Sequence, residues 1–326
     1  MADFSMTASA KSAIQYSGAD THTRELFVES LARGLDMVWK RDFTDKPKQG
    51  MLYMSEGTVK QPTAKFQTFR TIGGVVGQNR DTDDMDFVTR ADGFGFEVVT
   101  YPYRQGIKIE RELEETDDVG VIRGMQSDLA ENALMTQEYA VADVFNRSIA
   151  PTSAPLLADD GMYLIDSGRP NANPEAGTWS NEESTSAITP TSLATAQLNA
   201  RNTTDENGFP YPRNIVKLLI HKNDEKTVEE IMKSDKNPLN ANNTYNTMYN
   251  RFKWEVYDYL TTRSIFYIMD DPKSEKNELR FYWRKKPEFK TWVGDNPDVT
   301  SQRVRFIFGI GCGSPRKVWR GGLVTA

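Results

Sequence analysis

YRQGIKIERELEETDDVGVIRGMQ, residues 103–126, changes its hydrophobic period halfway along its length. In the first half Ile107 and Ile109 alternate with charged residues, a pattern that predicts a half-buried strand. From about residue 118 to residue 148 the apolar residues recur at helical spacing. A helix of that length would span about 45 Å at 1.5 Å per residue. The sequence therefore predicts one strand that leads directly into one unusually long helix.

Composition indicates a folded, globular protein and not a disordered one. The chain has 326 residues, of which 38% are hydrophobic and 26% charged, enough apolar material for a substantial core. Its net charge of −6 argues against a general nucleic-acid binder. The longest apolar runs are far too short to span a bilayer, and residues 1–19 lack the apolar run of a signal peptide. We expect neither a membrane-bound nor a secreted protein.

The residues that usually carry catalysis are scarce. There are two histidines and a single cysteine, Cys312, too few for a zinc cluster or a disulfide framework. The acidic run at residues 81–86 lacks the glycine and glutamate of a calcium loop. The glycine-rich run at residues 309–313 is followed by a proline and by strand-like sequence, where a phosphate loop would open a helix. We therefore expect no catalytic residue, no cofactor and no metal site.

The first hundred residues contain an arm and a long β excursion. A helical pattern covers residues 23–41, and alternating strands are predicted at 64–72 and 94–101. The connector between the two strands is polar and rich in glycine. A lone two-stranded ribbon is marginally stable in water, and the sequence offers it no obvious local partner. A neighbouring subunit is the candidate that would cover it.

The rest of the chain predicts a mixed α+β region followed by a β-rich return. Helices are predicted at 192–202 and 223–234, with a buried strand from Asn214 to His221 between them. A short strand is predicted at 162–165. Two separate strands are predicted at 279–286 and 288–294.

The order of these parts resembles the major capsid protein of tailed phages of the Hong Kong 97 type. Residues 103–118 resemble the strand that leads into that family's spine helix. Residues 159–234 resemble the head subunits of Mu-like phages, and residues 303–322 resemble the closing strands. The resemblance covers roughly residues 23–322 and implies an α+β fold of the Hong Kong 97 type.

The resemblance also implies a division of the chain. It assigns residues 1–49 to an N-terminal arm and 50–99 to an extended hairpin, the E-loop. Residues 100–151 and 301–326 would form the peripheral domain, which holds the spine helix, and residues 152–300 the axial domain. The arm and the E-loop would each lie on a neighbouring subunit.

The implied function is self-assembly into hexamers and pentamers of an icosahedral head shell. Its partners would be further copies of the chain, portal, scaffolding and decoration proteins, and double-stranded DNA that is confined without specific binding. The protein would be assembled in the host cytoplasm and located in the virion. It would bind no membrane.

Two sets of residues are candidates for these roles. The first set would bridge subunits and comprises, in the E-loop and at its base, Lys60, Lys65, Phe66, Arg70, Glu110, Arg111 and Glu112. A covalent crosslink through Lys60 or Lys65 is not expected. Residues 107–147 hold ten acidic and four basic residues, so the long helix is acidic. The second set would repel packaged DNA from the inner wall and comprises Asp128, Glu131, Glu138 and Asp143.

Three other readings remain open at this stage. The first is an encapsulin-like cargo compartment, which has the same fold. The second is a cytoplasmic enzyme with an α/β domain at residues 192–234. The third is a phage tail or decoration protein, although tail-tube subunits are usually smaller and lack so long a helix.

Overall fold

A computed structural model gives the fold of the chain. The structure describes residues 34, 36–44, 48–70, 90–116, 120–149, 157–183, 187–210, 213–236, 245–271, 279–293 and 298–322. The acidic run at 81–86 and most of the predicted helix at 23–41 lie outside these residues. The chain divides into two compact units. Unit 1 comprises Met1–Asp45, Gln105–Ala130 and Phe289–Val304, and unit 2 comprises Lys46–Arg104, Glu131–Glu288 and Arg305–Ala326.

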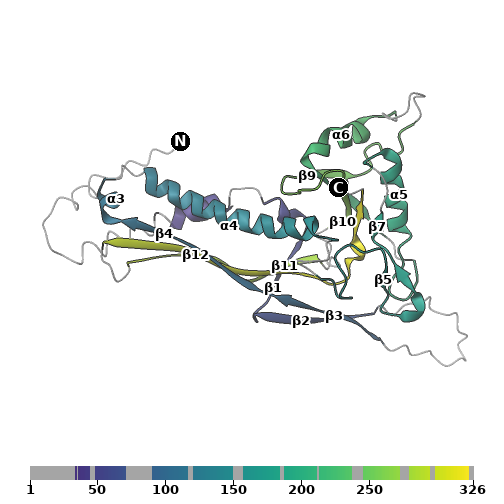
Figure 1. Ribbon diagram of the computed structural model, residues 1–326, viewed down its shortest axis with the longest axis horizontal. Helices are drawn as coiled ribbons and strands as arrows, with labels where there is room; N and C mark the ends of the chain where they lie inside the picture. The colour runs from purple at the N-terminus through teal and green to yellow at the C-terminus, as the bar shows by residue number, and fades with distance from the viewer. Residues whose placement is uncertain are drawn as a thin grey trace, which may run out of the picture. The chain divides into compact units, whose positions relative to one another are not determined.

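The strand-to-helix prediction is confirmed. β4 (Tyr101–Glu110) leads through the short helix α3 (Arg111–Thr116), which the sequence did not predict, into α4 (Gly120–Asn146) (Figure 1). Ile109 and Ile122 form a buried cluster, which shows that the apolar side of β4 packs against the start of α4. The apolar stripe of α4 continues through side chains that are almost fully buried, including Leu129, Ala133, Val141 and Phe145.

Four strands form one sheet in the order β1-β11-β12-β4. β1 (Ser55–Thr58) runs parallel to β11 (Leu279–Val293), which neighbours β12 (Val299–Cys312). The prediction of two strands at 279–294 is wrong, because β11 is continuous through Pro287. β1 pairs only with Arg280–Trp283, so no described strand needs a backbone N–H from Pro287 on that side. A proline is tolerated in a strand at such an edge.

The end of the predicted arm packs within its own unit. Residues 36–44 are helical, and Trp39 is 4% exposed. Its ring stacks on Phe43 at 5.0 Å and on Phe289 of β11 at 6.2 Å between ring centroids. This part of the arm therefore buries its largest side chain on its own chain, and not on a neighbour as we expected.

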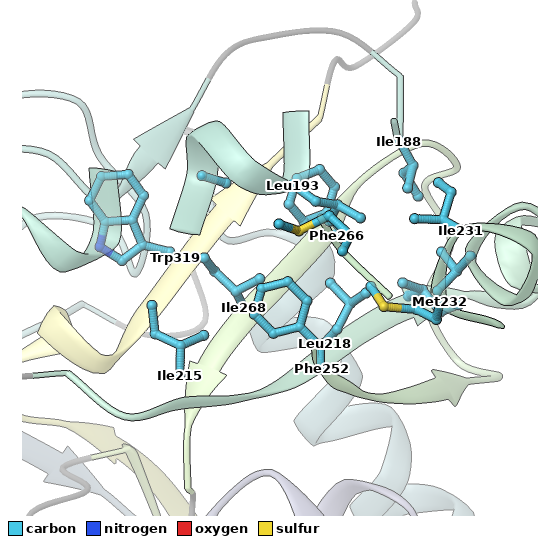
Figure 2. Packing of buried hydrophobic residues seen from close by; sticks show 14 of the residues in the cluster. Ile188, Leu193, Ile215, Leu218, Ile231, Met232, Phe252, Phe266, Ile268 and Trp319 are labelled. Atoms are coloured by element: carbon cyan, nitrogen blue, oxygen red, sulfur yellow. The ribbon is translucent and has the colours of Figure 1, made fainter. Parts of the chain in front are cut away.

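A second sheet holds the main core of unit 2. Its order is β7-β13-β10-β8-β9, with bounds Glu182–Glu183, Val318–Gly321, Phe266–Asp270, Ile215–His221 and Lys253–Tyr257. Side chains from α5 (Pro190–Arg201) and α6 (Glu225–Lys233) meet this sheet (Figure 2). The cluster includes Leu193, Leu218, Ile231, Met232, Phe266, Ile268 and Trp319. Both predicted helices and the predicted buried strand are confirmed.

Local signals in the sequence explain where α5 begins. Thr189 accepts a hydrogen bond from the backbone N–H of Ser192 at 3.0 Å, and the Ser192 hydroxyl accepts one from the N–H of Thr189 at 2.9 Å. This capping box satisfies two donors that would otherwise be unpaired at the helix start. Pro190 occupies the first turn, where its missing N–H costs nothing.

The remaining elements are short. β5 (Arg169–Pro170) pairs with β6 (Thr178–Trp179), and four 3-10 helices, η1 to η4, cover Gly50–Leu52, Pro174–Ala176, Lys222–Asp224 and Pro315–Lys317. The strand predicted at 162–165 does not form. Tyr163 makes only an isolated bridge to Leu157.

Candidate functional site

The predicted β excursion is a two-stranded antiparallel ribbon. β2 (Thr63–Phe69) pairs with β3 (Asp92–Val99), with Thr63 opposite Val99 and Phe66 opposite Phe96 (Figure 1). Beyond Phe69 and Asp92, Arg70 and Arg90 continue the contact: the guanidinium of Arg90 donates to the carbonyl of Arg70 at 3.1 Å. The ribbon confirms the predicted pair of strands.

The base of the ribbon packs on its own chain. Val98 is completely buried, and with Val59 and Tyr282 of β11 it forms an apolar cluster. Phe66 stacks on Phe96 and on Tyr282, with ring centroids 5.1 Å apart in each pair. The expectation that the ribbon has no local partner is therefore wrong at its base. Phe66, a candidate for bridging subunits, already packs its ring against aromatic residues of its own chain.

The basic candidates on the ribbon remain available for contact. Lys60 and Lys65 are exposed, and Arg70 is half-buried. Lys65 lies opposite Glu97 with 3.9 Å between the charged atoms, and the Lys65 side chain is 82% exposed. A pair so open to water contributes little to stability, so Lys65 can exchange this partner for one on another molecule.

Glu110, Arg111 and Glu112 do not lie at the base of the ribbon. Glu110 ends β4, eleven residues along the chain from the ribbon's end at Val99, and Arg111 and Glu112 begin α3. All three residues are exposed, and Arg111 forms an ion pair of 3.5 Å with Asp298. The prediction that these three residues lie at the base of the ribbon is not supported by their places at the end of β4 and the start of α3.

The acidic candidates on α4 fall into two classes. Asp128 and Glu131 are exposed, whereas Asp143 is half-buried and forms an ion pair with Arg147 one turn later. Glu138 is 5% exposed, so the prediction that it belongs to a solvent-facing acidic wall is wrong. Glu138 lies four residues after Leu134 and three before Val141, on the apolar stripe of the helix, and that spacing was the signal that sequence reasoning overlooked.

Glu138 holds the start of the β excursion to α4. The backbone N–H of Gly50 donates to the Glu138 carboxylate at 2.7 Å, and the hydroxyl of Tyr257 lies 3.2 Å from the same oxygen. Burial raises the pKa of Glu138, while the Gly50 N–H, Tyr257 and the charge of Lys48 oppose that rise. Burial likewise lowers the pKa of Lys48, and nearby Glu56 and Glu138 oppose that change. The cluster thus joins three segments that are distant in sequence.

A second buried polar network fixes the loop between Asp159 and Glu183. Arg169 is fully buried, forms an ion pair with Asp160 at 2.7 Å and lies over the ring of Trp179 at 5.3 Å. Arg316 lies over the same ring at 4.4 Å and donates to the side-chain oxygen of Asn171. Burial lowers the pKa of Arg316 against the raising effect of nearby acids. This network ties the C-terminal segment to the loop.

The potential metal ligands among the described residues do not form a site. Within them, no group of three or more His, Cys, Asp or Glu side chains is placed to hold a metal ion. His221 accepts a hydrogen bond from the N–H of Asn223 at 3.1 Å, which is a helix-capping role. Of the helices that the structure describes, none combines the length and apolar character needed to cross a bilayer. The features that stand out among the described residues are the exposed candidates on the ribbon and α4 and the buried polar clusters around Glu138 and Arg169.

Comparison with solved structures identifies the fold. The chain matches the capsid of the cyanophage P-SCSP1u with a TM-score of 0.57 at 12% identity, over 86% of this chain and 89% of that one. It matches the mature capsid of bacteriophage PhiM1 with a TM-score of 0.53 at 10% identity, over 86% and 88%. A virus-like particle from Pyrococcus furiosus matches with a TM-score of 0.52 at 8% identity, over 89% and 98%.

Comparison with protein families is more specific. No curated protein matches the sequence. The family model described as phage capsid protein matches residues 95–321, well over half of the chain. This match does not favour the encapsulin-like compartment, and it argues against the enzyme and tail-protein readings. The kinship with Mu-like head subunits is not confirmed by these matches. The chain belongs to the phage capsid protein family, and its fold is that of the Hong Kong 97-type head shells.

Proposed function

We propose that the chain is the major head subunit of a tailed phage, assembled into hexamers and pentamers around packaged double-stranded DNA. The observation that carries this proposal is the capsid family match over residues 95–321. The family is one of shell proteins, which implies a virion location and a structural role. Assembly in the host cytoplasm, with portal, scaffolding and decoration proteins as partners, is part of the proposal.

The proposed division of the subunit keeps the arm at residues 1–49 and the E-loop at 50–99. The peripheral domain would contain 100–151 and 301–326, and the axial domain would contain 152–300. The pairing of strands favours one change to each of these two domains. β11 pairs in the sheet of β12 and β4, so residues 279–300 would join the peripheral domain, while β13 pairs in the sheet of β10 and would join the axial domain.

The ribbon supports the role of the E-loop. Its base is anchored by Val98, whereas Phe69, at the other end of β2, is 49% exposed. An anchored base with an exposed apolar far end suits an element that reaches a neighbouring subunit, because the neighbour supplies the cover that the subunit lacks. Lys60, Lys65 and Arg70 are the proposed contact residues, and Phe66 is proposed to stiffen the base.

The acidic wall is proposed in a reduced form. Asp128 and Glu131 are exposed on α4 and would repel DNA within a Debye length, about 8 Å at physiological salt. Glu138 has no part in it because it is buried, and Asp143 contributes little because Arg147 neutralises it.

Expression of the chain alone and together with the neighbouring genes of its source, followed by negative-stain electron microscopy, tests the function. We expect closed icosahedral shells, or capsomers and open sheets when the partners are absent. A stable monomer that forms no particle under either condition would refute the proposal.

A further inference from the structure

Polar side chains are completely buried where the start of α4 packs within unit 1. On α4, Ile122 and Leu129 are buried, and Gln126 lies between them on the same side of the helix with none of its surface exposed. On β12, Thr300 and Gln302 are also completely buried. All of these residues belong to unit 1. Their relative positions follow from the pairing of β12 with β4.

β4 and β12 are antiparallel neighbours in the four-stranded sheet. Tyr103 of β4 stacks on Phe306 of β12 with 5.6 Å between ring centroids. Gly106 lies beside Arg303, since a Cβ atom on the glycine would be 3.6 Å from the Cβ of the arginine. The residue number on β12 falls as the number on β4 rises, which defines the antiparallel direction. Residues opposite each other in such a pair share one side of the sheet.

This register places Gln302 level with Ile107 and Thr300 level with Ile109. Ile109 is buried against Ile122 of α4, and Ile107 packs on the same cluster. Both polar residues of β12 therefore lie on the side of the sheet that α4 covers.

Gln126 reaches the same place from the helix. It follows Ile122 by one helical turn, about 6 Å along the axis. β4 ends one residue after Ile109, so a helix that continued beyond this end would leave Gln126 uncovered by the sheet. Because Gln126 is completely buried, α4 returns along the sheet toward the level of Gln302. The three polar side chains therefore form one polar layer between α4 and β12.

The polar layer lacks hydrogen-bond partners among the described residues. The unpaired atoms are Nε2 and Oε1 of Gln126, Nε2 and Oε1 of Gln302, and Oγ1 of Thr300. The large majority of buried side-chain polar atoms in folded proteins are paired, because an unpaired one is unfavourable. A mutual pair of the two amides would use one N–H and the oxygen of each and would leave the second N–H of each. The layer therefore needs a partner that both donates and accepts.

We propose that ordered water molecules bind in the polar layer, held by Gln126, Gln302 and Thr300. The unpaired atoms include donors and acceptors and no charged group, and water pairs with both kinds. A lone ion would satisfy one kind only and would itself be a buried charge. A buried water makes about three hydrogen bonds, so the five unpaired atoms indicate about two molecules.

These waters would have a positioning role. They would join α4 to β12 through directional hydrogen bonds, and a fully satisfied polar network fixes one arrangement of a core. The site lies within one subunit and needs no shell. The inference therefore goes beyond the proposed function and does not rest on it, and its failure would leave that function untouched.

Oxygen-17 magnetic relaxation dispersion on the unassembled protein counts the internal waters that exchange slowly. The dry variant carries Gln126→Met, Gln302→Met and Thr300→Val, which remove the polar atoms with little change in size. The control carries the same kinds of change at exposed positions, Gln61→Met, Gln105→Met and Thr191→Val. We expect the dry variant to lose about two slowly exchanging waters relative to the wild type and the control. An equal count in all three proteins would overturn the proposal.

Urea denaturation tests whether the two glutamines share the waters. Gln126→Met or Gln302→Met alone would take one partner from waters that the other glutamine still holds, whereas the double variant removes both partners. The two single shifts of the urea midpoint should therefore sum to more than the shift of the double variant, because residues with shared partners are not additive. Additive shifts would contradict the proposal. Coupling with an unchanged water count would indicate a direct amide pair and would also overturn it.

Should the dry variant fail to fold, the wild type alone decides. Nuclear Overhauser effects between water and the side-chain amide protons of Gln126 and Gln302, in protein labelled with nitrogen-15 glutamine, detect waters bound beside these groups. The two single variants assign the signals. A water cross-peak is expected at both amides, and its absence would overturn the proposal.

Discussion

Replacement of Glu138 gives the sharpest test of how α4 holds the start of the E-loop segment. Glu138→Ala removes the acceptor of the Gly50 N–H, which lies 2.7 Å from the carboxylate in a buried site. An unsatisfied buried donor costs about 2 kcal/mol, within a range of roughly 1–3 kcal/mol. Glu138→Gln keeps an acceptor at the same place and removes the charge whose burial is unfavourable. We expect Glu138→Ala to destabilise the protein and Glu138→Gln to be close to neutral.

Native-state hydrogen exchange on unassembled protein measures the effect where it arises. A loss of about 2 kcal/mol corresponds to a roughly thirtyfold change in a local opening equilibrium. The amides of residues 50–53 should therefore exchange roughly thirtyfold faster in Glu138→Ala than in the wild type. Equal exchange in the Ala and Gln variants would refute the reasoning, because it would show that the hydrogen bond to Gly50 does not hold the segment.

The same pair gives a pH dependence of defined sign. Burial raises the folded-state pKa of Glu138 above its ordinary value of 4.5, so ionisation disfavours the folded state. The penalty is absent at low pH and grows as the pH rises from 4.5 towards the raised pKa. Urea denaturation should therefore show the stability of Glu138→Gln gaining on the wild type across that window and then levelling off. A gain in the opposite direction would contradict burial as the main cause.

Three further changes probe other parts of the subunit. Gly311→Ala would place a Cβ 2.4 Å from a methyl group of Val98. Because this clash would loosen the packing of the ribbon on β12, limited proteolysis should cleave the ribbon several-fold faster, and an unchanged rate would contradict that packing. Arg169→Met should destabilise unit 2 by about 3–5 kcal/mol, because it leaves a buried carboxylate without its partner; thermal melting would show no shift if the ion pair were dispensable. Asp128→Lys combined with Glu131→Lys should lower the ratio of DNA-filled to empty heads in a complementation assay, and a normal ratio would exclude the acidic wall.

Local periodicity was sufficient to predict α4 and the ribbon, because both patterns extend over many residues. It did not reveal that Glu138 lies on the buried side, although the spacing from Leu134 and Val141 contains that information. A carboxylate on an apolar stripe is normally unfavourable. What makes it acceptable here is a backbone N–H from Gly50, 88 residues earlier, and a contact so distant in sequence leaves no local signal.

Non-local pairing also explains the other errors. Pro287 interrupts the strand pattern in sequence, yet it falls where the described part of β11 has no neighbour on the β1 side. The ribbon's base was predicted to lack a local partner because Tyr282 lies some 180 residues further along the chain. Among the candidate residues, exposure of Lys60, Lys65, Asp128 and Glu131 could be predicted, since charged residues usually stay in contact with water.

The two glycines of β12 determine how force would pass through the subunit. A Cβ on Gly309 would come within 2.4 Å of the Val99 carbonyl oxygen, and Gly311 is equally close to Val98. Ile307, two residues before Gly309 on the same strand, is 5% exposed. Tension applied to the hairpin would therefore be transmitted to β12 at these two contacts, where the strands lie too close to admit a side chain between them.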